Sequence, residues 1–177
     1  MRLGPGQILG SEGNGLEMSG KWLTYGRIFV GASCCGKAER LLGLATEWAA
    51  TRKQFGQAIA NFQGIQFQLS DMATELEAGR HLVYHAAWLA QNGRPYGKEA
   101  AMAKLFCSEL AMRNTTKAIQ VHGGYGYTKD YPVERYLARL APPGTGVAMP
   151  SLAALGFATT NLAALGIAPG MSGAAQR

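Results

Sequence analysis

The chain has 177 residues, of which 47% are hydrophobic and 16% charged, so it can bury one substantial core and is not disordered by composition. Its formal net charge is +6, but lysine and arginine occur singly or in pairs among acidic residues, which argues against a nucleic-acid-binding surface. The three cysteines show no zinc-binding spacing and are expected to be free, buried thiols.

Residues 1–14 are rich in glycine and are predicted to form a connector that lacks the apolar core of a secretory leader. A long amphipathic helix is predicted from Gly15, because apolar residues recur every three or four positions as far as the stretch TRKQFG. Gly56 in that stretch is expected to stop the helix. The apolar stripe of this helix consists of Ile28, Ala32, Cys35, Ala38, Leu42, Ala45 and Ala49, widened by Leu41 and Trp48.

Three further helices are predicted along the chain. The second begins near Asn61, a residue suited to capping, and stops at the stretch QNGRP. The third covers about residues 96–122, and the fourth starts at Pro132. Apolar positions of the third helix are Met102, Phe106, Leu110, Ala118 and Val121. Long helices joined by short turns predict an all-α fold, an antiparallel up-down four-helix bundle over residues 15–139.

The character of the chain changes after Arg139. Residues 140–176 contain no charged residue and no histidine, and they are rich in alanine, glycine and proline. We expect residues 140–177 to form a poorly ordered or weakly helical tail. An apolar stretch of about 20 residues would be long enough to span a membrane, but Pro150 and Asn161 dilute this one and disfavour that alternative.

Taken alone, each residue that could carry chemistry also has a plainer structural interpretation. The glycine turn HGGYGY, residues 122–127, could approach a phosphate, yet such turns more often just end a helix. Arg52 could clamp a phosphate and Phe55 could stack on a ring, but for either residue alone the favoured explanation is structural: a solvated helix end for Arg52 and a core anchor for Phe55. His81 and His85 are one helical turn apart, and a packed or solvated pair is favoured over a metal site.

Several motifs occur together in a fixed order. The stretch RKQFGQAIANFQGIQFQLSDMATELEAGR is followed by AIQVHGGYGYTKDYPVERY, and these contain the elements R-x-x-F-G, F-Q and Q-x-x-G-G-x-G. The stretches ILGSEGNG and AAMAKLFCSELA lie before and between them. In this order and at this spacing, residues 7–137 resemble the C-terminal helical domain of the acyl-CoA dehydrogenase family. In that family the connector would be the end of a preceding β domain.

The resemblance implies FAD as the cofactor and a homo-oligomer, a dimer or tetramer, in which the dinucleotide lies between subunits. Arg52 and Phe55 match residues that contact the cofactor from a neighbouring subunit, and Gln63 lies in the same contact region. The turn that holds the adenine side of the cofactor is matched by Gln120, Gly123 and Gly124. Arg27, in the stretch TYGRI, matches an arginine near the acyl-CoA pocket.

The implied reaction is the FAD-dependent α,β-dehydrogenation of an acyl-CoA thioester to a 2-enoyl-CoA, with an electron-transferring flavoprotein as electron acceptor. The family base is a glutamate, either in a YEGT-like motif or directly before the arginine that Arg27 matches. Here Gly26 precedes Arg27, and no glutamate follows Glu134. We therefore predict no catalytic residue and expect this chain alone to be inactive. The resemblance also implies a cytoplasmic protein, or one of the mitochondrial matrix in a eukaryote.

Two alternatives follow from these departures. The chain could be a non-catalytic helical module that oligomerises or associates with a fuller family member. It could also be a truncated or frameshifted fragment, because one inserted nucleotide before codons for Arg-Asp would yield Ala138–Arg139 and an uncharged tail. A tail that tethers the bundle to a membrane is a third, less favoured hypothesis.

Overall fold

A computed structural model describes residues 4–140 of the chain. The described part is helical apart from one small hairpin. The expectations for the tail concern residues 141–177 and lie outside the described residues. The elements in order are a 3-10 helix at Pro5–Gln7, α1 at Gly15–Thr51, strands β1 at Lys53–Gln54 and β2 at Gln57–Ala58, a 3-10 helix at Ile59–Asn61, α2 at Gln63–Gln91, α3 at Gly97–His122, a 3-10 helix at Gly123–Tyr127, and α4 at Val133–Leu140.

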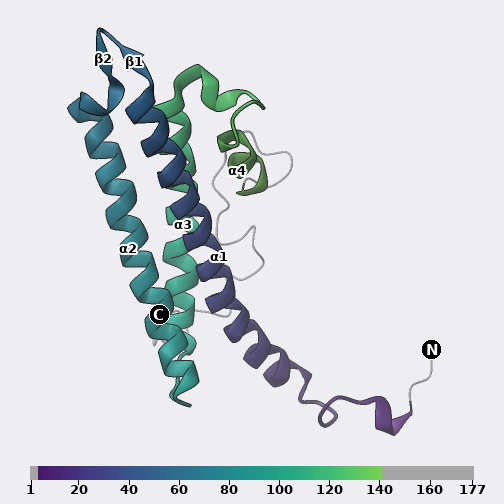
Figure 1. Ribbon diagram of the computed structural model, residues 1–177. Helices are drawn as coiled ribbons and strands as arrows, with labels where there is room; N and C mark the ends of the chain where they lie inside the picture. The colour runs from purple at the N-terminus through teal and green to yellow at the C-terminus, as the bar shows by residue number, and fades with distance from the viewer. Residues whose placement is uncertain (1–3, 141–177) are drawn as a thin grey trace, which may run out of the picture.

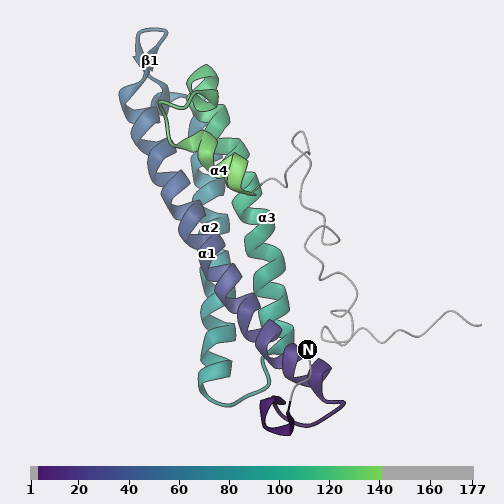
Figure 2. The same ribbon diagram turned by 90° about the vertical axis from the view of Figure 1, so that its right-hand side faces the viewer.

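The three long helices lie side by side, and each runs antiparallel to the one before it (Figure 1, Figure 2). The short α4 packs against α3 near the end of the bundle that carries the hairpin. This arrangement confirms the predicted all-α four-helix fold. Among residues 4–140, no helix has both the length and the apolar character that crossing a membrane would require.

The core lies where the apolar stripes of α1, α2 and α3 meet. Leu41, Met72 and Leu110, one from each helix, have no exposed surface. Burying a side chain of this size contributes roughly 1.5–3 kcal/mol, so the shared core rather than helix propensity holds the helices together. Val133 brings α4 into the same core, since it is also fully buried.

Gly79 on α2 lies where α1, α2 and α3 approach one another closely. A Cβ atom there would lie 2.9 Å from Cδ2 of Leu110 and 3.3 Å from the sulfurs of both Cys35 and Cys107. The Cys35 thiol donates to the Cys107 sulfur at 3.5 Å, and the Cys107 thiol donates to the Gly79 carbonyl at 3.6 Å. The absence of a side chain at Gly79 therefore allows α1, α2 and α3 to share one layer of the core. All three cysteines are free and buried, as expected.

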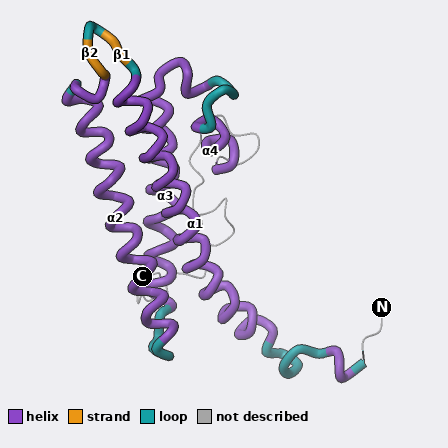
Figure 3. The backbone as a smooth tube through the Cα atoms, in the orientation of Figure 1, coloured by secondary structure: helices purple, strands orange, loops and turns teal. Residues whose placement is uncertain are grey.

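Three departures from the sequence-based expectations concern the bounds or presence of elements. The segment between α1 and α2 forms a hairpin that was not predicted, because strands of two residues leave no pattern of alternation (Figure 3). The helix α1 ends at Thr51 rather than at Gly56, because Arg52 adopts an extended conformation that leads into this hairpin. The expected start of α2 near Asn61 is also early, since Asn61 ends a 3-10 helix and α2 begins at Gln63.

Two predicted core positions, Ala32 and Met102, are exposed. Both lie at the margin of their apolar stripe. In α1 the buried positions nearby are Gly31 and Cys34. The other buried positions of α1 were predicted: Ile28, Cys35, Ala38, Leu41, Ala45 and Ala49.

Candidate cofactor-binding site

The end of α1 fixes the backbone of Arg52 from two sides. Its backbone N–H donates to the Trp48 carbonyl at 2.8 Å, and its carbonyl accepts from the N–H of Ile59 at 2.9 Å. The hairpin between them turns through two residues, Phe55 and Gly56, which have φ values of 53° and 83°. Positive φ at both turn positions is the type I′ geometry that matches the twist of paired strands. The hairpin thus projects beyond the bundle while its base remains anchored.

The glycine turn at the end of α3 contains glycines of two kinds. Gly123 has a φ of 63° and a ψ of −138°, and its backbone N–H bonds to the carbonyls of Gln120 and Ile119 to close the helix. That conformation is essentially restricted to glycine. Gly124 is different, because its φ is not in the left-handed region and a Cβ atom there would have no neighbour within 4 Å. The fold therefore requires glycine at position 123 but not at position 124.

The ends of α1 and α3 form one pocket of about 230 Å³. Arg52 enters it from α1, while Gly123 and Gly124 enter it from the turn after α3. Three of the residues predicted from the sequence are thus brought together, although they are separated by some 70 positions in the chain. The other lining residues are Trp48, Gln54, Ile59, Val121, His122 and Tyr125.

An aromatic cluster lies behind Arg52. The rings of Trp48 and His122 stack with centroids 5.1 Å apart, and Tyr131 meets Trp48 edge-on at 5.0 Å. Tyr125 completes the cluster at 5.3 Å from Trp48. The guanidinium carbon of Arg52 lies 5.2 Å from the Tyr125 ring centroid and 6.0 Å from the Trp48 ring centroid.

No carboxylate neutralises Arg52 within residues 4–140, where the ion pairs involve other cations. Its guanidinium lies over the faces of Trp48 and Tyr125, so the in-plane N–H groups remain available for an anion. A guanidinium suits phosphate because its planar fork matches pairs of phosphate oxygens. The pocket therefore combines a cation that has no ion-pair partner among residues 4–140 with backbone at Gly124 that no side chain covers.

The structure places the other predicted cofactor residues near this pocket but outside its lining. The Phe55 ring, at the hairpin tip, is 93% exposed and lies edge-on to the Phe62 ring, with the ring centroids 6.2 Å apart. Gln63 begins α2 and Gln120 lies in the last turn of α3, and both are exposed. These three side chains face solvent, where a partner or a larger ligand could reach them.

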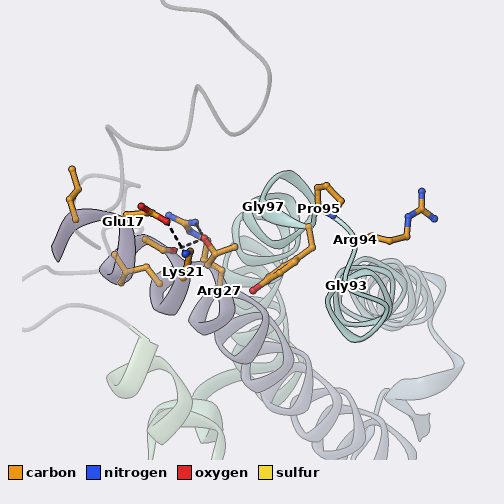
Figure 4. Close-up of a pocket in the computed structure, with 12 residues that line it drawn as sticks. Glu17, Lys21, Arg27, Gly93, Arg94, Pro95 and Gly97 are labelled. Atoms are coloured by element: carbon orange, nitrogen blue, oxygen red, sulfur yellow. Dashed lines mark hydrogen bonds and ion pairs between the residues drawn. The ribbon is translucent and has the colours of Figure 1, made fainter. Parts of the chain in front are cut away.

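Arg27 does not belong to this pocket. It lies on α1 25 positions before Arg52, and at about 1.5 Å per residue the two are roughly 38 Å apart. Arg27 instead lines a larger hollow of about 770 Å³ between the start of α1 and the turn that joins α2 to α3 (Figure 4). The two predicted kinds of site residue therefore lie at opposite ends of the bundle.

The larger hollow carries charged groups of both signs. Glu17 and Lys21 form an ion pair at 2.8 Å, and Nη1 of Arg27 donates to Oγ1 of Thr24 at 3.1 Å. Nε of Arg27 is buried without a hydrogen-bond partner, and burial lowers the pKa of Arg27. The Arg94 side chain points away from this group (Figure 4). Arg27 is thus a half-buried cation of the hollow, with its Nε atom buried.

Sequence reasoning missed several lining residues of the smaller pocket. Gln54, Ile59 and Tyr125 were not identified, and Trp48 was assigned only to the apolar stripe of α1. The signal that could have found Trp48 is its spacing, because residues four apart on a helix lie on one face and Arg52 follows Trp48 by four. His81, which was weighed for metal binding, is exposed beside Glu77 at 3.8 Å. No cluster of three metal-ligating side chains occurs within residues 4–140.

Comparisons with known proteins cover most of the chain. The family model described as "Acyl-CoA dehydrogenase, C-terminal domain" matches residues 13–146. An acyl-CoA dehydrogenase of Bacillus subtilis is 52% identical over 130 residues, which is 73% of this chain and 34% of the relative. The chain thus spans about a third of the length of the curated relatives that it matches.

Solved structures show the same relation. A chain in the structure of the electron-transferring flavoprotein of Acidaminococcus fermentans is 51% identical, with a TM-score of 0.74 over 75% of this chain and 35% of that one. PigA, solved with FAD and proline, is 28% identical, with a TM-score of 0.77 over 90% of this chain and 40% of that one. The chain belongs to the acyl-CoA dehydrogenase family, and it carries the C-terminal domain of that family.

Proposed function

We propose that this chain is the cofactor-binding C-terminal part of an acyl-CoA dehydrogenase-type flavoprotein. The activity of the whole protein would be the FAD-dependent α,β-dehydrogenation of an acyl-CoA thioester to a 2-enoyl-CoA. One observation carries the proposal: the guanidinium of Arg52, which has no carboxylate partner among residues 4–140, shares a pocket with Gly124. The fold itself does not require glycine at position 124. PigA, a relative by fold, was solved with FAD, which supports the choice of cofactor.

The residues fit the pyrophosphate of a dinucleotide. Arg52 offers several N–H donors to the phosphate oxygens, and the bare backbone at Gly123 and Gly124 permits close approach. Gln54 in the lining and the exposed Gln120 beside it add amide groups that could hydrogen-bond ribose or adenine. Accepting a hydride is the chemistry that FAD supplies when it is bound, whereas this chain binds and orients its adenine side.

The pocket is a half-site. Its volume of about 230 Å³ is below the range of roughly 300–1,000 Å³ typical of small-molecule sites. The exposed ring of Phe55 and the exposed amides of Gln63 and Gln120 extend the same end of the bundle outward. We infer that a second subunit completes the site in a homodimer or homotetramer, with Phe55 and Gln63 reaching a cofactor held mainly by that subunit.

The substrate is assigned to the opposite end of the bundle. Arg27 would face an acyl-CoA, since it is a half-buried cation in the lining of the 770 Å³ hollow and its Nε has no hydrogen-bond partner. Gly26 stands where some family members place the catalytic glutamate, so the base for the α-proton is not supplied at that position. An electron-transferring flavoprotein is the proposed electron acceptor. Three free cysteines fit the reducing cytoplasm in which we place the protein.

The alternative is a non-catalytic helical module that keeps the bundle and perhaps half of the FAD site. It is favoured by Gly26, which stands where some family members place the catalytic glutamate. Under this alternative the chain would oligomerise or join a fuller family member. It predicts flavin binding without acyl-CoA-dependent reduction, or no flavin binding at all.

The test is to equilibrate the purified chain with excess FAD, remove free FAD, and record the absorbance of bound flavin. We expect bound flavin for the wild-type chain and its loss in Arg52→Ala. Arg40→Ala is the matched control, since Arg40 is an exposed arginine of the same helix that lies outside the pocket. A wild-type chain without bound flavin, or an Arg52→Ala variant that retains it, contradicts the proposal. Bleaching of bound flavin by acyl-CoA then separates the enzyme from the module.

A further inference from the structure

The Arg52 side chain is held without being neutralised. Long arginine side chains at helix ends normally sample many rotamers, and ordering one costs conformational entropy. Here the guanidinium lies over two rings, 5.2 Å from the Tyr125 centroid and 6.0 Å from the Trp48 centroid. A carboxylate partner would hold the cation as well but would compete with an incoming anion. Aromatic faces attract the cation and leave its in-plane N–H donors free.

The Trp48 ring is itself fixed by α3. His122 is 5% exposed, and its ring stacks on Trp48 with an angle of 13° between the planes. Nδ1 of His122 lies 2.8 Å from the carbonyl of Ala118. Because a carbonyl can only accept, Nδ1 carries the proton of this hydrogen bond and the imidazole orientation is set. Tyr131 packs edge-on against the same indole at 5.0 Å.

These contacts form one chain of support from the backbone of α3 to the guanidinium on α1. We propose that Trp48 is a positioning residue that, with Tyr125, holds the Arg52 guanidinium toward the pocket as an uncompensated cation for the pyrophosphate of the cofactor. The inference rests on the proposed function for its ligand. The placement of Arg52 by Trp48 is a property of the ligand-free chain and can be measured without any cofactor.

The first measurement is the NMR signal of the Arg52 side chain in the full, ligand-free chain labelled at arginine. A group over an aromatic face is shifted upfield by the ring current, so Arg52 should be shifted from the values of exposed arginines such as Arg40. Trp48→Leu keeps an apolar side chain but removes the face, and should move the Arg52 signals toward ordinary values. Trp48→Phe should restore part of the shift, and Trp22→Leu, at an indole 74% exposed near the other end of α1, should change nothing.

The second measurement is the affinity for ADP, which carries the pyrophosphate and the adenosine of FAD. We expect Trp48→Leu to weaken ADP binding about fivefold to tenfold, as expected for a lost cation–π contact together with freer motion of Arg52. Trp48→Phe should stay within about threefold of the wild type, because a phenyl face still attracts the cation. Trp22→Leu should bind as the wild type does.

A Trp48 variant could also lose stability, since the indole packs against the core. Tyr125→Leu provides the second variant, because Tyr125 is 44% exposed and its loss should leave the fold intact. It should reproduce the shift of the Arg52 signals and the weaker ADP binding. Unchanged Arg52 signals in both Trp48→Leu and Tyr125→Leu overturn the inference, as does unchanged ADP affinity in folded variants. If the wild-type chain binds neither ADP nor FAD, the proposed function fails, while the Arg52 signals still decide its placement.

Discussion

At the scale of single residues, the three glycines of the turn after α3 have separate reasons to be glycine. Gly123 is set by its backbone conformation, with a φ of 63°. Gly126 is set by packing, because a Cβ atom there would lie 2.8 Å from the carbonyl oxygen of Ile119. Gly124 has neither constraint. A glycine that the fold does not need, in a pocket beside a free cation, is best explained by a ligand.

This difference gives the first prediction. Gly124→Ala should change the free energy of unfolding by less than about 0.5 kcal/mol, because the new methyl group meets no atom of the chain. It should nonetheless weaken FAD binding, since the methyl group occupies the surface along which the phosphates would lie. Gly126→Ala is the control and should destabilise the chain by about 1–3 kcal/mol through overpacking. Urea unfolding and flavin retention together test this, and full retention of FAD in Gly124→Ala would refute the assignment.

At the scale of the helices, the sequence and the structure agree where periodicity is strong. Both α1 and α3 were predicted from apolar stripes, and their buried residues recur at helical spacing from Ile28 to Ala49 and from Ala100 to Val121. The hairpin could not be predicted, since its strands have two residues each and its turn carries Phe55 rather than the asparagine that usually signals a type I′ turn. Local pattern is informative only over several turns of helix or several strand residues.

The candidate site was predictable only in part, for the same reason. Arg52 and the glycine turn could be identified one by one, but their meeting depends on how the ends of α1 and α3 pack. That packing also creates the contact between Trp48 and His122, which are 74 positions apart. Arg27 shows the reverse case, since it lies on α1 and Arg52 directly follows α1, yet the two residues line different hollows. Tertiary contacts, rather than residue type, decide which candidates share a site.

The layer at Gly79 gives a prediction at the scale of packed helices. Burial and the neighbouring Cys35 raise the pKa of the Cys107 thiol, and burial raises the pKa values of Cys34 and Cys35 as well. Folded thiols therefore keep protons that the unfolded chain releases above about pH 8.5. The contribution of these protonated thiols to stability is fully present below that pH and is lost as the pH rises above it. The free energy of unfolding should fall by up to about 1.4 kcal/mol per pH unit for each such thiol.

Urea unfolding under reducing conditions between pH 7.5 and pH 10 measures this slope. Cys107→Ala should be less stable than the wild type at neutral pH, because it removes a buried sulfur, but its stability should fall less steeply with pH. The comparison of the two slopes cancels the lysines and tyrosines that also titrate in this range. Parallel slopes would show that the Cys107 thiol is not the group responsible.

At the scale of the whole molecule, Phe55 links the stability of the single chain to its assembly. A non-glycine residue with a φ of 53° is strained by about 1–2 kcal/mol, and the ring gains little in return, since it is 93% exposed. Strain of this kind persists where function requires the residue. In the proposed assembly, the partner subunit and its FAD would cover the ring. The isolated chain therefore has the backbone strain at Phe55 without the burial of its ring.

Phe55→Asn should separate the two effects. Asparagine tolerates the left-handed conformation, so the variant chain should be more stable to urea by about 0.5–1 kcal/mol. It should also form less dimer or tetramer in the presence of FAD, because the aromatic contact with the partner is gone. Sedimentation velocity with and without FAD measures the assembly, and Phe67→Asn, at a 62% exposed phenylalanine on α2, controls for the loss of a surface ring. A Phe55→Asn chain that assembles with FAD as the wild type does would place Phe55 outside the subunit interface. A gain in stability coupled to a loss of assembly would instead show that the hairpin is shaped for a neighbouring subunit rather than for its own chain.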